Sequence, residues 1–179
     1  MYWIMKAKNE AMKDEIRDFS QELLKISSIS LDEKKAAEFI CARMKQLGYD
    51  ETFIDDAGNA IGVIRGRDPE PAVILNSHID TVAPDEEKWT MSPFRGIIEG
   101  GKLFGAGASD CKGGLGAQVY AGALLKRSLL PMRGSVIMAA TVAEENGCSI
   151  GLRKLISDTI PSLGLKAGYA ILGEPTGNG

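Results

Sequence analysis

Several features that would place a protein in a common class are scarce in this sequence of 179 residues. It has three cysteines, an odd number, and no CxxC pair, which argues against a disulfide framework or a thiolate zinc site. We therefore expect a cytoplasmic protein, kept in a reducing compartment. The formal net charge of -3 gives no electrostatic reason to expect a nucleic acid or an anionic membrane as a partner.

Long apolar runs are also missing. No segment approaches the roughly 20 apolar residues of a transmembrane helix. The first ten residues, MYWIMKAKNE, hold too short an apolar stretch for a signal peptide. Apolar material for a core is present, because 44% of the residues are hydrophobic. A chain of this length and composition is expected to form one domain.

The order of apolar patterns predicts alternating helices and strands. Apolar residues at helical spacing predict helices over residues 7–26, 30–47, 113–130 and 151–159. Ser30 followed by Glu33 is a capping-box pattern and predicts the start of the second helix. Continuous or alternating apolar runs predict strands at 50–54, 60–65, 72–75, 134–143 and 167–172, with a hairpin at 96–104. This order indicates an α/β fold.

Side chains suited to metal binding follow three of the predicted strands, each of which is a short apolar run typical of a buried strand. These side chains are His78 and Asp80, Glu144 and Glu145, and Glu174. Sites in open α/β sheets form at the carboxyl ends of strands. His78 is the single histidine of the chain, and Asp80 is two residues away, so both share one side of an extended backbone. That spacing suits a metal-bound imidazole supported by a carboxylate. Adjacent glutamates point in different directions, so one can bind metal while the other moves protons.

A further candidate lies in the glycine-rich loop 105–114, with Asp110 at its centre and a predicted helix behind it. Five small residues at 105–109 let the backbone run close to whatever Asp110 faces. Successive candidates along the chain, from Asp80 through Asp110 and Glu144 to Glu174, are separated by about 30 residues, which is the length of a strand–helix–strand unit. We therefore predict a metal site at the strand ends, bridged by Asp110.

Simpler explanations remain open at this stage. Asp110 is placed to cap the following helix, the glutamate pair can be an acidic loop, and His78 can be a structural histidine. A triad of Ser109, His78 and an aspartate is weakly supported, because the loop lacks the last glycine of a nucleophile elbow. The loop also lacks the third glycine of a dinucleotide fingerprint and the lysine signature of a phosphate loop, which disfavours nucleotide binding.

Two other sets of charged residues receive structural interpretations. Turn chemistry explains Asp55 and Asp56, within 55–59, better than metal binding does. Lys112 is interpreted as a solvated charge; it follows Asp110 and Cys111 in the glycine-rich loop.

Four motifs in order resemble a known family: SHIDTV at 77–82, GAGASDCKGG at 105–114, the glutamate pair before NGCSIG at 146–151, and GEPT at 173–176. They resemble the dinuclear zinc hydrolases of the acetylornithine deacetylase, succinyl-diaminopimelate desuccinylase, aminoacylase and glutamate carboxypeptidase family. The resemblance extends from the N-terminal helix to Glu174. It implies a three-layer αβα catalytic domain with a mostly parallel sheet, and hydrolysis of amide bonds in N-acyl amino acids or short peptides.

The resemblance also implies a role for each candidate residue. Asp80 would orient the histidine, and the peptide bond after the bridging aspartate would be cis. Glu144 would be the general base that takes a proton from the metal-bridging water; the resulting hydroxide would attack the amide carbonyl, and Glu144 would return a proton to the leaving amine. Cobalt or manganese would also suit the site. Four residues would bind two zinc ions: His78 and Glu174 one ion, Glu145 the other, and Asp110 both.

The sequence departs from the family pattern in two ways. Ala106 and Cys111 stand where many members have arginine and methionine, and we interpret both as tolerated variation, although Cys111 could confer sensitivity to oxidants. Family members are also much longer: after the GEPT region they insert a lid or dimerisation domain and then complete the catalytic domain, including its last zinc-binding histidine. Residues 1–179 would be the N-terminal portion of the catalytic domain.

That departure limits what we expect of this chain. It would bind one metal ion, leave the second site weak or empty, and show little or no hydrolysis on its own. A homodimer would be a property of the full-length protein, whose substrate would be a small molecule. The alternative is a non-catalytic fragment or binding module that keeps the fold with at most one metal.

Overall fold

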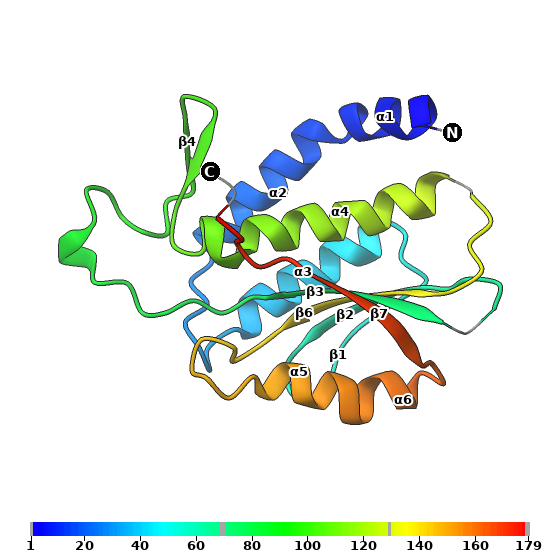
Figure 1. Ribbon diagram of the computed structural model, residues 1–179. Coiled ribbons are helices and arrows are strands. Elements are labelled where there is room, and N and C mark those ends of the chain that lie inside the picture. The colour runs from blue at the N-terminus through cyan, green and yellow to red at the C-terminus, as the bar shows by residue number, and fades with distance from the viewer. Residues whose placement is uncertain (1, 69–70, 129, 178–179) are drawn as a thin grey trace.

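Helices and strands alternate through most of the chain in the computed structural model, which describes residues 2–68, 71–128 and 130–177. Figure 1 shows them in the order α1 (Tyr2–Ala11), α2 (Lys13–Lys25), α3 (Lys34–Gln46), β1 (Glu51–Ile54), β2 (Ala60–Ile64), β3 (Ala72–His78), η1 (Glu86–Lys88), β4 (Ile97–Glu99), β5 (Lys102–Phe104), η2 (Ala108–Lys112), α4 (Gly113–Ser128), β6 (Val136–Thr141), α5 (Ile150–Lys154), η3 (Leu155–Thr159), α6 (Ile160–Ser162) and β7 (Ala167–Leu172).

One five-stranded sheet in the order β1-β2-β6-β3-β7 forms the middle layer. β3 pairs in parallel with both β6 and β7, whereas β2 runs antiparallel to its neighbours β1 and β6. Among the described strands of this sheet, only β2 therefore runs against the common direction. The mostly parallel sheet expected from the sequence is confirmed, and it brings the carboxyl ends of β3, β6 and β7 to the same edge.

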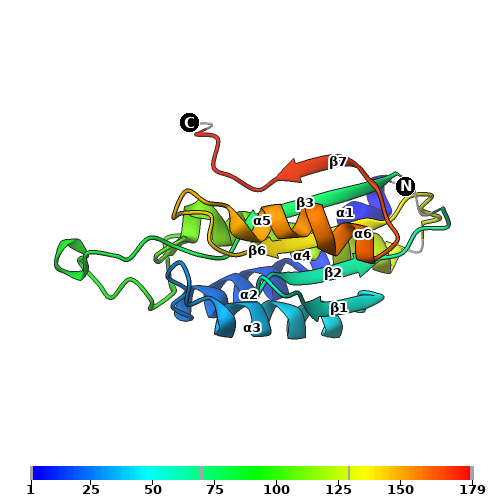
Figure 2. The same ribbon diagram turned by 90° about the horizontal axis from the view of Figure 1, so that it is seen from below.

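Helices cover both faces of the sheet and complete a three-layer αβα arrangement. Helices α2, α3 and α4 lie on one face, and the segment from α5 to α6 lies on the other, over β3 and β6 in Figure 2. Two apolar clusters correspond to these faces. The first joins the three long helices to the sheet through residues such as Phe19, Met44 and Leu115, and the second joins Leu155 and Ile160 to β2, β3 and β6.

The strands and helices form where the sequence patterns place them because each buries its apolar positions. β6 is buried along its whole length and β3 along most of it, as expected for central strands covered on both faces. In α2, Phe19 and Leu23 are fully buried, and the Phe19 ring stacks on Phe39 with centroids 5.4 Å apart. Burial of a side chain of this size stabilises the fold by about 1.5–3 kcal/mol.

Several predicted boundaries need correction. The helix expected at 7–26 is two helices, α1 and α2, which meet at Met12. The helix expected to start at Ser30 starts at Lys34, and no side-chain hydrogen bond caps it, so the capping-box prediction is wrong. The helix expected at 151–159 extends through α6 to Ser162. The hairpin β4–β5 and the turn at 55–59 are found as predicted.

The last strand, β7, differs from the buried strand that its apolar sequence predicts. All six of its residues are exposed. Within the part of the chain that the structure describes, β7 is the edge strand of the sheet and pairs only with β3. Tyr169 and Ile171 are more than half exposed. An apolar edge strand of this kind is a ready surface for pairing with another strand.

None of the helices within the described residues has both the length and the apolar composition needed to cross a membrane.

Candidate metal centre

Every candidate residue named from the sequence lies near the carboxyl edge of the three parallel strands. His78 is the last residue of β3, Glu144 and Glu145 follow β6 after a short turn, and Glu174 follows β7. Asp110 comes from the loop that leads into α4, whose N-terminal end lies at the same edge in Figure 1. The strand-end pattern in the sequence therefore corresponds to a real gathering of side chains.

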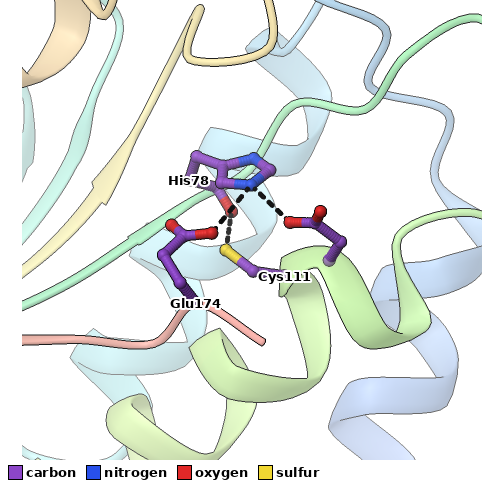
Figure 3. A group of neighbouring side chains, drawn as sticks. His78, Cys111 and Glu174 are labelled. Atoms are coloured by element: carbon purple, nitrogen blue, oxygen red, sulfur yellow. Dashed lines mark hydrogen bonds and ion pairs between the residues drawn. The ribbon is translucent and has the colours of Figure 1, made fainter. Parts of the chain in front are cut away.

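His78 is held by its backbone surroundings with one ring nitrogen directed at carboxylates. Its Nδ1–H donates to the backbone carbonyl of Asp80 at 2.9 Å, and its Nε2 lies 3.0 Å from Asp110 Oδ1. The same Nε2 lies 3.7 Å from Glu174 Oε2, and Figure 3 shows the Glu174 carboxylate directed at the ring. The side chain is 1% exposed. Because Nδ1 is engaged by a carbonyl, Nε2 is the nitrogen that faces the site.

The carboxylates around His78 produce a negative potential that favours positive charge at the site. Burial alone would lower the pKa of His78, but its hydrogen-bonding partners, Asp80 first among them, raise it to about 12. Burial and then the charge of Asp110 raise the pKa of Glu145. Burial also raises the pKa of Glu174, an effect that His78 opposes and that Asp110 reinforces. A divalent cation would relieve this crowding of negative charge.

Donor atoms from four residues converge closely enough to share one cation. One ligand atom each from His78, Asp110, Cys111 and Glu174 lies within 4.8 Å of the others. An imidazole nitrogen and carboxylate oxygens are donors accepted by zinc and by several other first-row divalent ions. By this chemical test, the residues present fit the divalent metal that the sequence resemblance implies.

The loop that carries Asp110 reaches the site through small residues. Gly107 adopts φ of +79°, and a Cβ atom there would lie 2.7 Å from Thr81 Cγ2. The Asp110–Cys111 peptide bond is cis, as the resemblance implied. Within the described residues, the Asp110 carboxylate hydrogen-bonds to His78 rather than to a helix amide, so the helix-cap interpretation is not supported.

Close backbone packing brings Glu174 to the other side of His78. A Cβ atom on Gly114, at the start of α4, would lie only 2.3 Å from the carbonyl oxygen of Gly173. The Gly173 N–H donates to Asn76 O at 2.8 Å and extends the pairing of β7 with β3 by one residue. Glu174 therefore enters the site from a strand end that lies directly against the helix.

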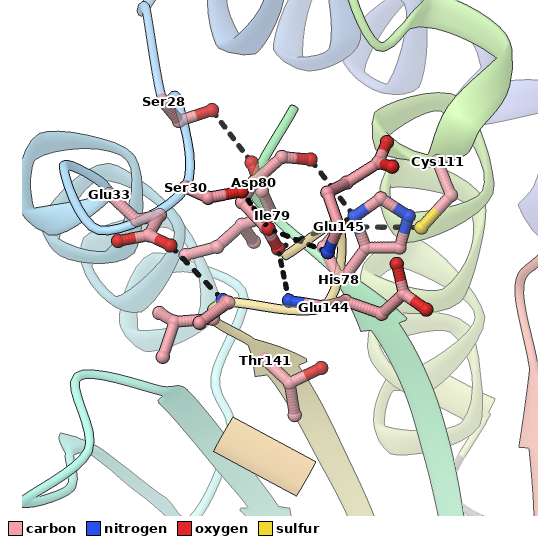
Figure 4. A network of polar contacts seen from close by, with 12 residues as sticks. Ser28, Ser30, Glu33, His78, Ile79, Asp80, Cys111, Thr141, Glu144 and Glu145 are labelled. Atoms are coloured by element: carbon pink, nitrogen blue, oxygen red, sulfur yellow. Dashed lines mark hydrogen bonds and ion pairs between the residues drawn. The ribbon is translucent and has the colours of Figure 1, made fainter. Parts of the chain in front are cut away.

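Asp80 organises the glutamate pair as much as it supports His78. Its carboxylate is buried and accepts hydrogen bonds from Glu144 N at 3.1 Å, Glu145 N at 3.0 Å and Ser30 Oγ at 2.7 Å, whereas His78 Nδ1 is 3.5 Å away (Figure 4). Burial would raise the pKa of Asp80, but these donors and His78 lower it to about 2. Asp80 is therefore a fixed anion that anchors two loop amides.

An open pocket of about 430 Å³ adjoins the candidate centre. Asp110 and Glu145 lie on its wall, together with segments 81–85 and 105–109 and with Trp89. This places the two carboxylates beside a space large enough for a small substrate.

Sequence reasoning missed three features of the site's surroundings. Lys112 is fully buried rather than solvated, and its Nζ donates to the carbonyl oxygens of Ile26 at 2.8 Å and Leu23 at 3.4 Å. Cys111 is buried beside His78, and its Sγ donates to the His78 carbonyl at 3.3 Å. Glu33 contacts the turn before the glutamate pair. For the burial of Cys111 beside His78, the sequence offered one signal, which is that Cys111 directly follows Asp110.

The structure supports the turn interpretation of Asp55 but not a catalytic triad that includes Ser109. Asp55 accepts hydrogen bonds from Ala57 N, Asn59 N and Asn59 Nδ2, which is turn chemistry, as predicted. Within the described residues, the Nε2 of His78 bonds to Asp110 and its Nδ1 to the carbonyl of Asp80, so neither ring nitrogen is directed at Ser109. A nucleophilic triad built on Ser109 therefore has no geometric support.

Comparisons with known proteins agree with this centre. The sequence profile of peptidase family M20/M25/M40 matches residues 74–179. A putative LysW-lysine/LysW-ornithine hydrolase of Pyrococcus abyssi is 36% identical over 168 residues, which cover 94% of this chain and 42% of the relative. A succinyl-diaminopimelate desuccinylase of Gluconacetobacter diazotrophicus is 30% identical over 166 residues, covering 88% of this chain and 42% of the relative.

A solved structure shows the same similarity in three dimensions. The M20 family metallo-carboxypeptidase Sso-CP2 of Sulfolobus solfataricus superimposes with a TM-score of 0.73 at 26% identity, covering 86% of this chain and 36% of that chain. The chain thus spans about two fifths of the length of the curated relatives that it matches, 42% in both cases given above.

Proposed function

This chain belongs to peptidase family M20/M25/M40, and we propose that the complete protein is a divalent-metal-dependent hydrolase of amide bonds. Its substrates are N-acyl amino acids or short peptides. The names of its relatives, a hydrolase, a desuccinylase and a metallo-carboxypeptidase, support this class of reaction. Zinc is the proposed metal, and cobalt and manganese are the alternatives that the same donors accept.

The observation that carries this proposal is the convergence of one imidazole and two carboxylates beside an open pocket. His78 Nε2 lies 3.0 Å from Asp110 and 3.7 Å from Glu174, and Asp110 also lines the pocket. We assign His78 and Glu174 to one ion, Glu145 to a second ion, and Asp110 to both. The bound metal would polarise the scissile carbonyl and lower the pKa of a water molecule.

Glu144 is the proposed proton carrier. Its side chain is exposed, whereas its backbone N–H is fixed by Asp80 at 3.1 Å. Its charge contributes to the raised pKa values of Glu145 and Glu174, which indicates that its carboxylate lies within electrostatic range of both. In the proposed reaction, Glu144 accepts a proton from the attacking water and delivers it to the nitrogen of the leaving amine as the C–N bond breaks.

Asp80 has two supporting tasks in this account. Its backbone carbonyl accepts the Nδ1–H of His78 and keeps Nε2 directed at Asp110. Its carboxylate holds the backbone of Glu144 and Glu145. Partners of this kind fix the orientation of metal-binding side chains and typically contribute a factor of about 10–100 in metal affinity or activity.

We also propose that this chain is the N-terminal portion of a catalytic domain that is completed elsewhere in a longer protein. Its coverage of only 42% of each curated relative described above supports this division. The chain alone then binds one metal ion, through His78, Asp110 and Glu174, with little or no hydrolysis. Cytoplasmic location and dimerisation of the complete protein remain predictions from the sequence.

The experiment that tests the proposed function compares wild type and Glu144→Gln in the complete protein. Initial rates are measured on a panel of N-acyl amino acids and dipeptides, with metal content determined in parallel. We expect kcat to fall by about 10²–10⁴, the usual contribution of general acid–base catalysis, while metal content is unchanged. The matched control is Glu99→Gln, an exposed glutamate in β4. Wild-type turnover in Glu144→Gln would remove Glu144 from the mechanism, and no hydrolysis of any panel member by wild type would contradict the function itself.

A further inference from the structure

Glu33 is a buried acid that neither caps the helix that follows it nor lies free in solvent. It is the residue before α3, yet its side chain makes no capping hydrogen bond to that helix. It is also only 6% exposed, so water does not solvate it freely. A buried carboxylate without partners is costly, so its hydrogen bonds identify what it does.

A single oxygen of Glu33 joins two distant turns. Oε1 accepts the N–H of Leu31 at 2.9 Å and the N–H of Ala143 at 3.1 Å, which lies 110 residues further along the chain. Figure 4 shows the contact with the backbone ahead of Glu144. The first contact fixes Glu33 on its own turn, and the second ties that turn to the end of the β6 segment.

Both turns are in a backbone conformation that residues with a Cβ atom rarely adopt. Leu31 has φ of +77° and Ala143 has φ of +55°. Left-handed backbone at residues other than glycine costs free energy and persists only when neighbouring contacts hold it. Such residues are concentrated at functional sites. Here Ala143 immediately precedes the proposed proton carrier, Glu144.

The Ala143 contact completes a series of three consecutive backbone anchors. Ala143 N donates to Glu33, and the next two amides, of Glu144 and Glu145, donate to the two oxygens of Asp80. Ser30 Oγ donates to the same Asp80 carboxylate, so both members of the expected capping box contact this region instead. Without the Glu33 contact, the loop would be anchored only at Glu144 and Glu145, by Asp80, and the left-handed residue Ala143 before them would lose this hydrogen bond.

We propose that Glu33 is a positioning residue, whose Oε1 holds Ala143 in the left-handed turn that directs Glu144 towards the site. This inference rests on the proposed function, in which Glu144 carries the proton. Glu33 contacts neither substrate nor metal in this account and acts through the backbone. Misplacing a reacting group by about 1 Å can reduce a rate about 10²-fold, so the expected effect falls on kcat rather than on KM.

The geometry makes a sharp distinction between two substitutions. Glu33→Gln keeps an oxygen that can accept both amide hydrogen bonds, whereas Glu33→Met has a similar length and no such acceptor. In the complete protein, we expect Glu33→Gln to stay within about twofold of wild-type kcat. We expect Glu33→Met to lose about 10- to 100-fold in kcat, with KM changed by less than about threefold. The control is Glu38→Met, which changes an exposed glutamate within α3 and should behave as wild type.

A second readout follows the loop directly. Hydrogen exchange of the backbone amides of residues 143–145 should be faster in Glu33→Met and unchanged in Glu33→Gln, at a temperature where circular dichroism shows all variants to be folded. If Glu33→Met does not fold, Glu33→Asp replaces it, because it keeps the carboxylate but shortens its reach by one methylene. We expect the same selective loss of kcat from Glu33→Asp.

The outcomes separate this proposal from the proposed function. Wild-type kcat in Glu33→Met, or in Glu33→Asp where that variant is used, would overturn the positioning role. An equal loss of kcat in Glu33→Gln and Glu33→Met would also overturn it, since an acceptor oxygen alone would then be insufficient. If wild type hydrolyses nothing on the panel, the proposed function fails while the exchange rates at 143–145 still decide whether Glu33 holds the loop.

Discussion

The two sides of the candidate centre are built very differently. His78 and Asp80 lie at the end of a central strand, and their side chains are 1% and 0% exposed. Glu174 follows an edge strand with every residue exposed, and its own side chain is 43% exposed. We call these the inner side, residues 78–80 and 143–145, and the outer side, residues 167–174.

The difference shows where the site obtains its precision. On the inner side, buried anions hold three successive amides and a carbonyl holds the imidazole, so the groups are fixed before any metal arrives. On the outer side, Glu174 is supported by the pairing of β7 with β3 and by the packing of Gly173 against Gly114. A ligand held in place needs little ordering when metal binds, whereas a loosely held ligand loses conformational entropy.

The largest expected effect comes from removing the inner ligand. His78→Ala should reduce zinc affinity by more than about 100-fold, beyond the 10- to 100-fold cost typical of losing a supporting partner. The chain has no other histidine to replace it. Isothermal titration of the metal-free folded protein with zinc measures the change. Near wild-type affinity in this variant would show that the metal binds elsewhere.

The matching substitution on the outer side should cost less. Glu174→Ala removes a ligand that is partly exposed and held by an edge strand, and that ligand must be ordered when the metal binds. We therefore expect zinc affinity to fall by only about 10- to 100-fold, the cost that is typical of losing a supporting partner. The same titration provides the comparison. The contrast between the two sides would be reversed if Glu174→Ala weakened binding more than His78→Ala does.

A smaller effect is expected from loosening the inner side without touching a ligand. Ser30→Ala removes the hydroxyl that donates to Asp80 Oδ2 at 2.7 Å. Hydrogen bonds to charged groups contribute about 1.5–3 kcal/mol, so the free energy of unfolding should decrease by about 1.5 kcal/mol. Urea unfolding followed by circular dichroism measures it. An unchanged unfolding midpoint would mean that the two backbone amides alone suffice to hold Asp80.

The smallest effect on stability is expected at the exposed edge. Ile171→Lys places a charge on β7, at a residue that is 56% exposed in the wild type. Surface substitutions usually change stability by no more than about 0.5 kcal/mol, and a lysine on an edge strand opposes strand pairing between molecules. Sedimentation velocity of the 179-residue chain should show less self-association, with zinc affinity unaltered. Unchanged association would place the contact on another surface.

Much of this arrangement could be predicted from the sequence because strand ends in a parallel sheet share one edge. Once 72–75, 134–143 and 167–172 were identified as strands, the gathering of His78, Glu144 and Glu174 followed from topology. The exposure of the edge strand β7 could not be predicted in the same way. An apolar run looks the same whether its strand lies at the centre or at the edge, and position in the sheet is set by pairings far apart in sequence.

The polar residues that were misassigned share one physical cause. Lys112, Ser30 and Glu33 each have a local explanation, as a solvated charge or a helix cap. Each of them nevertheless makes a hydrogen bond to a residue that lies between 50 and 110 residues away. Local patterns report only neighbours in sequence. Lys112 illustrates the point, since its ammonium group meets the carbonyl-rich C-terminal end of α2, where positive charge is favoured.

Elemental analysis of metal content most directly tests the claim that Asp110 lies at the heart of a metal centre. The 179-residue chain is loaded with zinc, desalted and checked for folding, alongside Asp110→Asn and the control Asp14→Asn, which alters an exposed aspartate in α2. The account predicts about one ion per folded chain in wild type and control, as expected for a three-ligand site, with the ion lost from Asp110→Asn. Retention of the ion by folded Asp110→Asn, or its absence from all three, would contradict the account.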